Sequence, residues 1–134
     1  MIRFIDANIF LRLLLWDDPP KAVACRKLFE KSLEHNEPLW TTSLVIAEII
    51  WVLEKTYQYP RTKIADAVLK ILATENIQIN EKGLLMESVA LYKIKNIDFI
   101  DAFNATTMLE SGIRTIYSYD TDFDGIHSIH RLEP

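Results

Sequence analysis

Short apolar runs alternate with longer segments of helical periodicity, and this alternation restricts the fold more than any other feature. The runs have the length and β-branched content of strands, and the segments between them repeat apolar residues every three or four positions. The candidate strands are residues 2–5, 39–42, 77–79, 113–118 and 129–132. Strands that alternate with helices form a parallel sheet covered on both faces. The sequence therefore predicts an α/β fold with a central parallel sheet of about five strands.

Several helix ends are marked by residues with known terminal preferences. Asp18 precedes two prolines, and Ser43 and Asp98 precede apolar helical segments, so each is a candidate N-cap. Pro60 begins another helix, and Gly112 is placed to end the helix that Asp98 opens. These signals predict where helices start and stop without reference to the rest of the fold.

The length and composition predict one domain over residues 1–134. A chain of 134 residues with 49% hydrophobic residues can bury a single core, and only 3 glycines and 5 prolines leave little room for a linker. The lone Cys25 cannot form an internal disulfide, which suits the cytoplasm, and we expect it to fill the core.

The apolar run from Ile9 to Trp16 is the nearest approach to a membrane segment. Asp6 precedes it and Arg12 interrupts it, whereas a signal peptide needs a basic start and an unbroken apolar stretch. No run reaches the roughly 20 residues that span a bilayer. We expect a cytoplasmic protein with no membrane contact.

Carboxylates occupy four places where a strand-like run meets a helix-like one. They are Asp6, Glu48, the pair Asp98 and Asp101, and the group Asp120 and Asp122. In open α/β sheets the carboxyl ends of the strands form the crevice where ligands bind. Carboxylates gathered there repel one another unless a hard cation is shared between them. The pattern predicts a nuclease site that depends on Mg²⁺ or Mn²⁺.

Asp6 and Glu48 each have a structural explanation to set against metal binding. Asp6 ends an apolar strand and would cap the helix that begins near Asn8, although a cap needs no second carboxylate nearby. Glu48 lies in a helix of almost entirely apolar residues, so we expect a buried position and a partner. An arginine or lysine is the alternative partner to a metal ion.

Asp98 and Asp101 stand three residues apart and share one face of a helix start. An N-cap role explains Asp98, while the helix dipole explains Asp101 only in part. Ala102 and Ala105 leave room beside Asp101. Asp101 is therefore the better candidate for a metal ligand.

Asp120, Asp122 and Asp124 follow the fourth predicted strand, where turn chemistry alone would place aspartates. Their spacing is that of a calcium loop, but Arg131 stands where such a loop needs its closing glutamate. Asp120, nearest the strand end, is the favoured ligand.

The net charge of −4 argues against broad, charge-driven binding of nucleic acid. It is compatible with a nucleic-acid enzyme, because bound cations reverse the local sign of an acidic site. Lys55, Arg61 and Lys63 are candidates for contacts to a phosphate backbone, although a solvated helix end is the better explanation for any one of them.

Four segments with these acids, residues 4–8, 43–48, 98–102 and 118–123, together resemble PIN-domain ribonucleases. The likeness is greatest to the VapC-type toxins of bacterial and archaeal toxin–antitoxin pairs, and it covers the whole chain to residue 134. The resemblance implies a three-layer α/β/α sandwich, homodimers, and RNA cleavage that depends on Mg²⁺ or Mn²⁺. It also implies a small cognate antitoxin, with an amphipathic helix in an apolar groove and an arginine that enters the acidic site.

The family's acidic positions map onto particular residues of this chain. The expected catalytic residues are Asp6, Glu48, Asp101 and Asp120, of which Asp6, Asp101 and Asp120 are the expected metal ligands. The expected supporting residues are Asn8, Asp98, Ser118 and Asp122. The chain departs from the family at Ala7, where threonine or serine is common, but it retains the acid and amide on either side.

The sequence leaves two other functions open and favours one oligomeric state. A receiver-like Mg²⁺-binding signalling domain is the first rival, although the paired acids near the first strand and the lysine after the fifth are not evident. A catalytically inactive PIN-like module that binds RNA or protein is the second, although all four acids are present. Apolar and aromatic residues around Trp51, Tyr57 and Tyr59 favour a homodimer.

Overall fold

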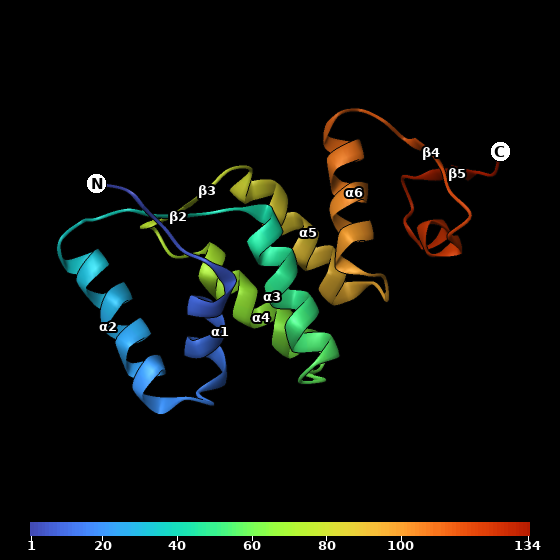
Figure 1. The fold of residues 1–134 in the computed structure, drawn as a ribbon. Coiled ribbons are helices and arrows are strands. Elements are labelled where there is room, and N and C mark those ends of the chain that lie inside the picture. The colour runs from blue at the N-terminus through green and yellow to red at the C-terminus, as the bar shows by residue number, and fades with distance from the viewer. The chain divides into compact units, whose positions relative to one another are not determined.

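Strands and helices alternate along the chain in the computed structural model, which describes residues 1–134 (Figure 1). The structure contains five strands, six α-helices and one short 3-10 helix. It divides into two compact units, Met1–Lys82 and Gly83–Pro134, and each unit contains its own sheet. The predicted α/β class is confirmed.

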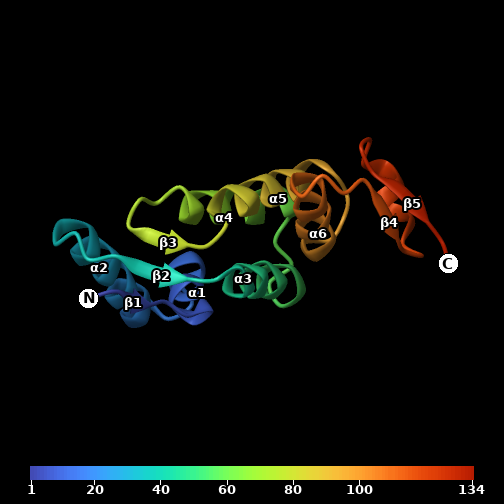
Figure 2. The ribbon, with the colours of Figure 1, turned by 90° about the horizontal axis from the view of Figure 1, so that it is seen from above.

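The first unit is built on three short parallel strands in the order β1-β2-β3 (Figure 2). Its elements are β1 (Arg3–Phe4), α1 (Ala7–Leu15), α2 (Pro19–Glu34), β2 (Leu39–Thr41), α3 (Ser43–Lys55), α4 (Arg61–Leu72) and β3 (Ile77–Ile79). The register places Leu39 beside Ile77 and Trp40 beside both Phe4 and Gln78. A parallel sheet of this kind requires a helical crossover between successive strands, which the predicted alternation supplies.

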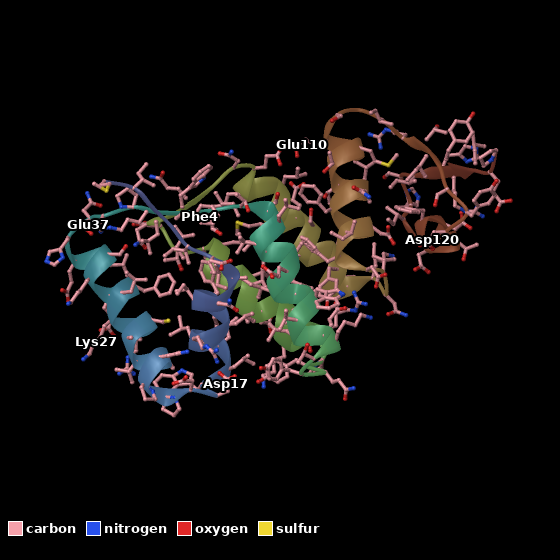
Figure 3. The ribbon with its side chains drawn as sticks, in the orientation of Figure 1. Phe4, Asp17, Lys27, Glu37, Glu110 and Asp120 are labelled. Atoms are coloured by element: carbon pink, nitrogen blue, oxygen red, sulfur yellow. The ribbon has the colours of Figure 1, made fainter.

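Helices α1, α2 and α4 lie on the same side of this sheet in Figure 1. The core on that side includes the fully buried Phe10, Leu39 and Ile64. The opposite face carries Phe4 (labelled in Figure 3) and Trp40, whose rings meet edge to face at a centroid distance of 5.8 Å. Both rings remain exposed, so within this unit the helices cover one face of the sheet.

The apolar run at residues 2–5 predicts a buried first strand, but β1 itself is not buried. Arg3 and Phe4 are exposed, and burial begins only at Ile5. The reason is that β1 is an edge strand and Phe4 points to the face that these helices leave uncovered. The end of the strand is nevertheless fixed, because the buried Thr41 hydroxyl donates a hydrogen bond of 2.9 Å to the Ile5 carbonyl.

Most of the predicted helix ends are observed. Asp18 caps α2 by accepting a hydrogen bond from the Lys21 amide, and Pro60 immediately precedes α4. The cap of α3 is Thr42, which accepts from the Val45 amide, whereas the predicted Ser43 is the first helical residue. The difference is one position, and both residues carry the hydroxyl that a cap needs.

The second unit consists of two packed helices followed by a small sheet. Its elements are α5 (Lys82–Ile94), α6 (Phe99–Glu110), β4 (Thr115–Tyr117), η1 (Thr121–Gly125) and β5 (His130–Leu132). The buried hydroxyls of Ser88 on α5 and Thr106 on α6 lie 2.5 Å apart in a hydrogen bond. Gly112 ends α6 as predicted, with a φ of 77° that favours glycine. The Ile113 amide closes the helix by donating to the Met108 carbonyl at 2.8 Å.

The five predicted strands are present, but they form two sheets. β4 pairs in parallel only with β5, from Thr115 opposite His130 to Tyr117 opposite Leu132, and the first sheet has three strands. The central sheet of about five strands is corrected to three. Strands of two or three residues form few hydrogen bonds with each neighbour, and the pairings observed lie within the separate units. The single domain over residues 1–134 stays a prediction.

None of the helices combines the length and the apolar character needed to cross a bilayer. Cys25 is buried in α2, as expected for a core residue.

Candidate metal centre

Three aspartates of the second unit converge and are called the acidic cluster here. Asp101, Asp120 and Asp122 each offer a carboxylate oxygen, and these oxygens all lie within 4.8 Å of one another. Asp101 comes from the first turn of α6, whereas Asp120 and Asp122 follow β4. Asp120 is labelled beside the 3-10 helix in Figure 3. Residues nearly 20 positions apart in the sequence thus meet at one point.

The turn after β4 is organised by its own side chains. The Asp120 amide donates to the Ser118 hydroxyl at 3.0 Å, and the Asp120 carboxylate accepts from the Asp122 amide at 2.9 Å. Asp120 thereby caps η1, and the Ser118 hydroxyl holds the backbone of Asp120 in place. The predicted turn chemistry and the predicted acidic site therefore involve the same residues.

Asp101 lies in a setting that favours its protonated form. Its pKa is raised above the ordinary 3.8, first by partial burial and then by the charge and hydrogen bond of Asp120. The charges of Asp98 and Asp122 raise this pKa further. The contributions of the neighbouring charges to this rise reflect repulsion among the carboxylates in the absence of a positive charge.

The acidic cluster fits a hard divalent cation. Mg²⁺ binds oxygen ligands at about 2.0–2.1 Å, so two oxygens on the same ion lie no more than about 4.2 Å apart. The observed oxygens all lie within 4.8 Å of one another, a bound close to that limit. The donor set consists only of carboxylate oxygens, which Mg²⁺ and Mn²⁺ prefer, and a cation there would offset the repulsion at Asp101.

Asp98 and Asn8 were predicted as supporting residues, and both are exposed. Asp98 occupies the N-cap position of α6, but its side chain makes no capping hydrogen bond. The N-cap role therefore does not explain why an aspartate stands at position 98. Its negative charge instead raises the pKa of Asp101. Asn8 lies in the first turn of α1.

Asp6 and Glu48 belong to the first unit, so the structure does not include them in the acidic cluster. Asp6 is exposed and caps α1, accepting a hydrogen bond of 2.6 Å from the Ala7 amide. Asp6 can cap the helix with one carboxylate oxygen and still offer the second oxygen to a metal ion. Its metal role stays a prediction.

The expected burial of Glu48 is wrong. Helix α3 buries one stripe, which consists of Val45, Ile46, Ile49, Ile50 and Leu53. Glu48 lies off that stripe and is exposed, so burial does not oblige it to have a partner. Its catalytic role rests on the family resemblance alone.

Arg131 on β5 contacts the acidic turn and was not among the predicted site residues. Its guanidinium donates to the Ser118 carbonyl at 2.9 Å and to both carboxylate oxygens of Asp124 at 3.0 and 3.2 Å. In the sequence, Arg131 is noticeable only as the residue that breaks a calcium-loop pattern. The one sequence feature that could have indicated its contacts is an arginine in the strand that follows an acid-rich turn.

A second feature is an apolar pocket of about 800 Å³ within the first unit. It lies among α1, α2, α3 and α4, and these helices contribute apolar residues to its lining. They are Phe10, Leu13 and Leu14 of α1, Phe29 and Leu33 of α2, Leu53 of α3, and Ala67 and Ile71 of α4. Lys63, Asp66 and Lys70 add charge to its lining.

The sequence model of the PIN domain matches residues 3–127, and the chain belongs to the PIN-domain family. This confirms the resemblance found in the sequence and favours it over a receiver domain.

Two known proteins were matched to this chain over most of their length. The VapC ribonuclease of Aquifex aeolicus (strain VF5) is 25% identical over 122 residues, which are 91% of this chain and 90% of the relative. A solved structure, VapC20 of Mycobacterium tuberculosis, is titled a sarcin-ricin loop cleaving toxin. It matches with a TM-score of 0.43 and 18% identity over 100% of both chains.

Proposed function

We propose that this chain is a divalent-metal-dependent endoribonuclease that hydrolyses RNA phosphodiester bonds, and that it is the toxin of a VapBC-type toxin–antitoxin pair. The observation that carries the proposal is the acidic cluster of Asp101, Asp120 and Asp122 in a chain of the PIN-domain family. The relative named a VapC ribonuclease supports the choice of RNA as substrate. The site acts in the cytoplasm, where RNA is available.

The carboxylates have separate tasks in this proposal. Asp6, Asp101 and Asp120 hold one or two Mg²⁺ or Mn²⁺ ions, and Glu48 is the fourth catalytic acid. When bound, such an ion lowers the pKa of a coordinated water and offsets the charge that develops on the phosphate. Asn8, Asp98 and Asp122 orient the ligands or bound water through hydrogen bonds and charge. Ser118 fixes the Asp120 backbone through the observed 3.0 Å hydrogen bond.

The proposal requires acids from both units, so it treats residues 1–134 as one functional domain. The PIN-domain match from residue 3 to residue 127 supports this, because it runs through the boundary at Lys82 and Gly83. Loss of a first-unit acid should therefore be as damaging as loss of an acidic-cluster residue.

Cleavage of RNA by the purified chain tests the enzymatic part. We expect cutting in Mg²⁺ or Mn²⁺, none in EDTA, and none by Asp6→Asn, which keeps the side-chain shape but removes its charge. Glu30→Gln is the matched control, since it removes an exposed carboxylate whose only ion pair is with Arg26 on the same helix. Undiminished cutting by Asp6→Asn, or by the wild type in EDTA, contradicts the proposal. RNA binding without cutting supports the inactive PIN-like module instead.

The toxin assignment requires a partner that restrains the enzyme. We propose a small VapB-type antitoxin whose amphipathic helix places its apolar face in the apolar pocket of the first unit. An arginine of the same antitoxin enters the carboxylate site, because a guanidinium can pair with two carboxylate oxygens at once. The size and apolar lining of the pocket support the first contact, and the negative charge around Asp101 supports the second.

Growth and co-purification test the toxin assignment. Expression of the chain alone should arrest growth. Growth should resume when the neighbouring small gene is co-expressed, and also when the chain carries Glu48→Gln or Asp101→Asn. Leu33→Asp should prevent co-purification of the antitoxin, because Leu33 lines the pocket yet is 54% exposed and is not needed for the core. Ile94→Asp is the control, at a residue that is 78% exposed and lies outside the pocket. Harmless expression with no small co-purifying protein contradicts the assignment.

A further inference from the structure

We infer that Arg131 is a positioning residue that holds the turn carrying Asp120 and Asp122 in the shape a metal ion requires. The inference rests on the proposed function, because it concerns the same carboxylate site. It assigns a role to a residue of β5 that lies outside the acidic cluster and is not expected to touch metal or RNA.

Arg131 ties together the two ends of the acidic turn. One nitrogen of the guanidinium donates to the Ser118 carbonyl at 2.9 Å, before Asp120 in the chain. Two other donations, at 3.0 and 3.2 Å, reach the two oxygens of Asp124, after Asp122. The Arg131 side chain is only 14% exposed, so it is held in place rather than free in solvent. The segment between its contacts contains Asp120, the proposed ligand, and Asp122, the proposed supporting residue.

The same contacts explain why Asp124 is absent from the acidic cluster. Asp120, Asp122 and Asp124 alternate along the turn, but only the first two join Asp101 in the group whose oxygens all lie within 4.8 Å of one another. Asp124 is paired with the planar fork of Arg131, a strong and directional arrangement. Arg131 therefore pairs with the third carboxylate of the turn, that of Asp124. The carboxylates of Asp120 and Asp122 remain to face Asp101.

The geometry requires arginine rather than a positive charge alone. A single guanidinium here reaches a backbone carbonyl, both oxygens of Asp124 and the Glu133 carboxylate at 2.9 Å. A lysine ammonium is a compact point charge and cannot reproduce this planar set of contacts. Arg131→Lys thus keeps the charge and the stem of the side chain but loosens the turn.

Binding of Mn²⁺ to the purified chain tests the inference without any cleavage assay. Paramagnetic resonance of free Mn²⁺ gives the dissociation constant directly. We expect Arg131→Lys to weaken binding by about tenfold, the lower end of the effect of residues that orient metal ligands. Asp124→Asn should weaken it in the same direction, since it removes the ionic partner of Arg131. Arg26→Lys is the control, because the contacts of Arg26, an exposed pair with Glu30 and the ring of Trp16, lie within the first unit and do not involve the acidic turn.

The outcomes separate this inference from the proposed function. If Arg131→Lys remains folded by circular dichroism and binds Mn²⁺ as tightly as the wild type, the positioning role is refuted while the metal site stands. If Asp124→Asn abolishes binding as fully as Asp101→Asn, Asp124 is itself a ligand and the inference is also refuted. If the wild type does not bind Mn²⁺, the metal-dependent function fails together with the inference. Wild-type binding that Asp101→Asn abolishes and Arg131→Lys weakens supports both.

Discussion

Removing one charge from the acidic cluster should stabilise the metal-free protein and destabilise it once metal is present. The substitution is Asp120→Asn. Asparagine accepts the capping hydrogen bond of η1 about as well as aspartate, so the turn keeps its 2.9 Å contact with the Asp122 amide. The change therefore reports mainly on charge.

The expected magnitude follows from the spacing of the cluster. Two unit charges at the largest separation of 4.8 Å repel by about 0.9 kcal/mol in water. Asp120 takes part in two of the three carboxylate pairs, and salt at about 0.15 M roughly halves each interaction. The substitution should thus raise the free energy of unfolding by about 1 kcal/mol in EDTA. For a chain of this length that corresponds to a rise of about 3–5 °C in Tm.

Millimolar Mg²⁺ should reverse the order of stability. A ligand at 100 times its Kd stabilises the folded state by about 2.7 kcal/mol, and the variant forfeits most of that gain. Thermal melting followed by circular dichroism, in EDTA and in Mg²⁺, measures both effects, with Glu30→Gln as the control. A variant that is less stable than the wild type in EDTA, or that responds equally to Mg²⁺, refutes the idea of a repulsive cluster relieved by a cation.

Two further predictions concern pH and assembly. The folded state binds the Asp101 proton more tightly than the unfolded state, because its pKa is raised above 3.8, so this group's contribution to stability falls as the pH rises from 3.8 through the raised pKa and is level above it. Denaturant melts of the metal-free protein and of Asp101→Asn between about pH 4 and pH 7 measure this, and an opposite slope contradicts it. The homodimer should be lost in Trp51→Glu, since Trp51 is 60% exposed and lies seven residues from the exposed Leu44 on α3. Light scattering measures the mass, and a monomeric wild type at micromolar concentration would remove the basis of this prediction.

The features that sequence reasoning predicted correctly are local ones. The α/β class, the cap at Asp18 and the end of α6 at Gly112 depend on a few neighbouring residues. The acidic turn after β4 is similar, since Asp120 and Asp122 interact through their own backbone. Local chemistry of this kind is expressed in the sequence itself.

The features that were missed depend on tertiary contacts. The exposure of Glu48 follows from which stripe of α3 packs inward, and its mostly apolar neighbours gave no indication of this. Which strands share a sheet depends on pairing between distant segments, so the division into three and two strands was not foreseen. Arg131 meets Ser118 and Asp124 only because β5 pairs with β4. Residue type and spacing alone could not assign it a role.

The central claim is that the carboxylates would hold a divalent ion, and that this ion would supply an activated water for the hydrolysis of an RNA phosphodiester bond. In that reaction the water oxygen forms the new bond to phosphorus, the bond to one ribose oxygen breaks, and that oxygen leaves with a proton. Attack by the neighbouring 2′-hydroxyl would instead leave a 2′,3′-cyclic phosphate.

Analysis of the cleaved RNA ends therefore tests the claim most directly. Purified wild-type chain and Asp101→Asn are incubated with single-stranded RNA in Mg²⁺ or EDTA, and both ends of each product are mapped. Mapping of 5′ ends after brief expression then identifies the cellular target. We predict cuts by the wild type only with Mg²⁺, no cuts by Asp101→Asn, and no cyclic phosphate on any product. Cyclic phosphate ends, or equal cutting in EDTA, would contradict the account.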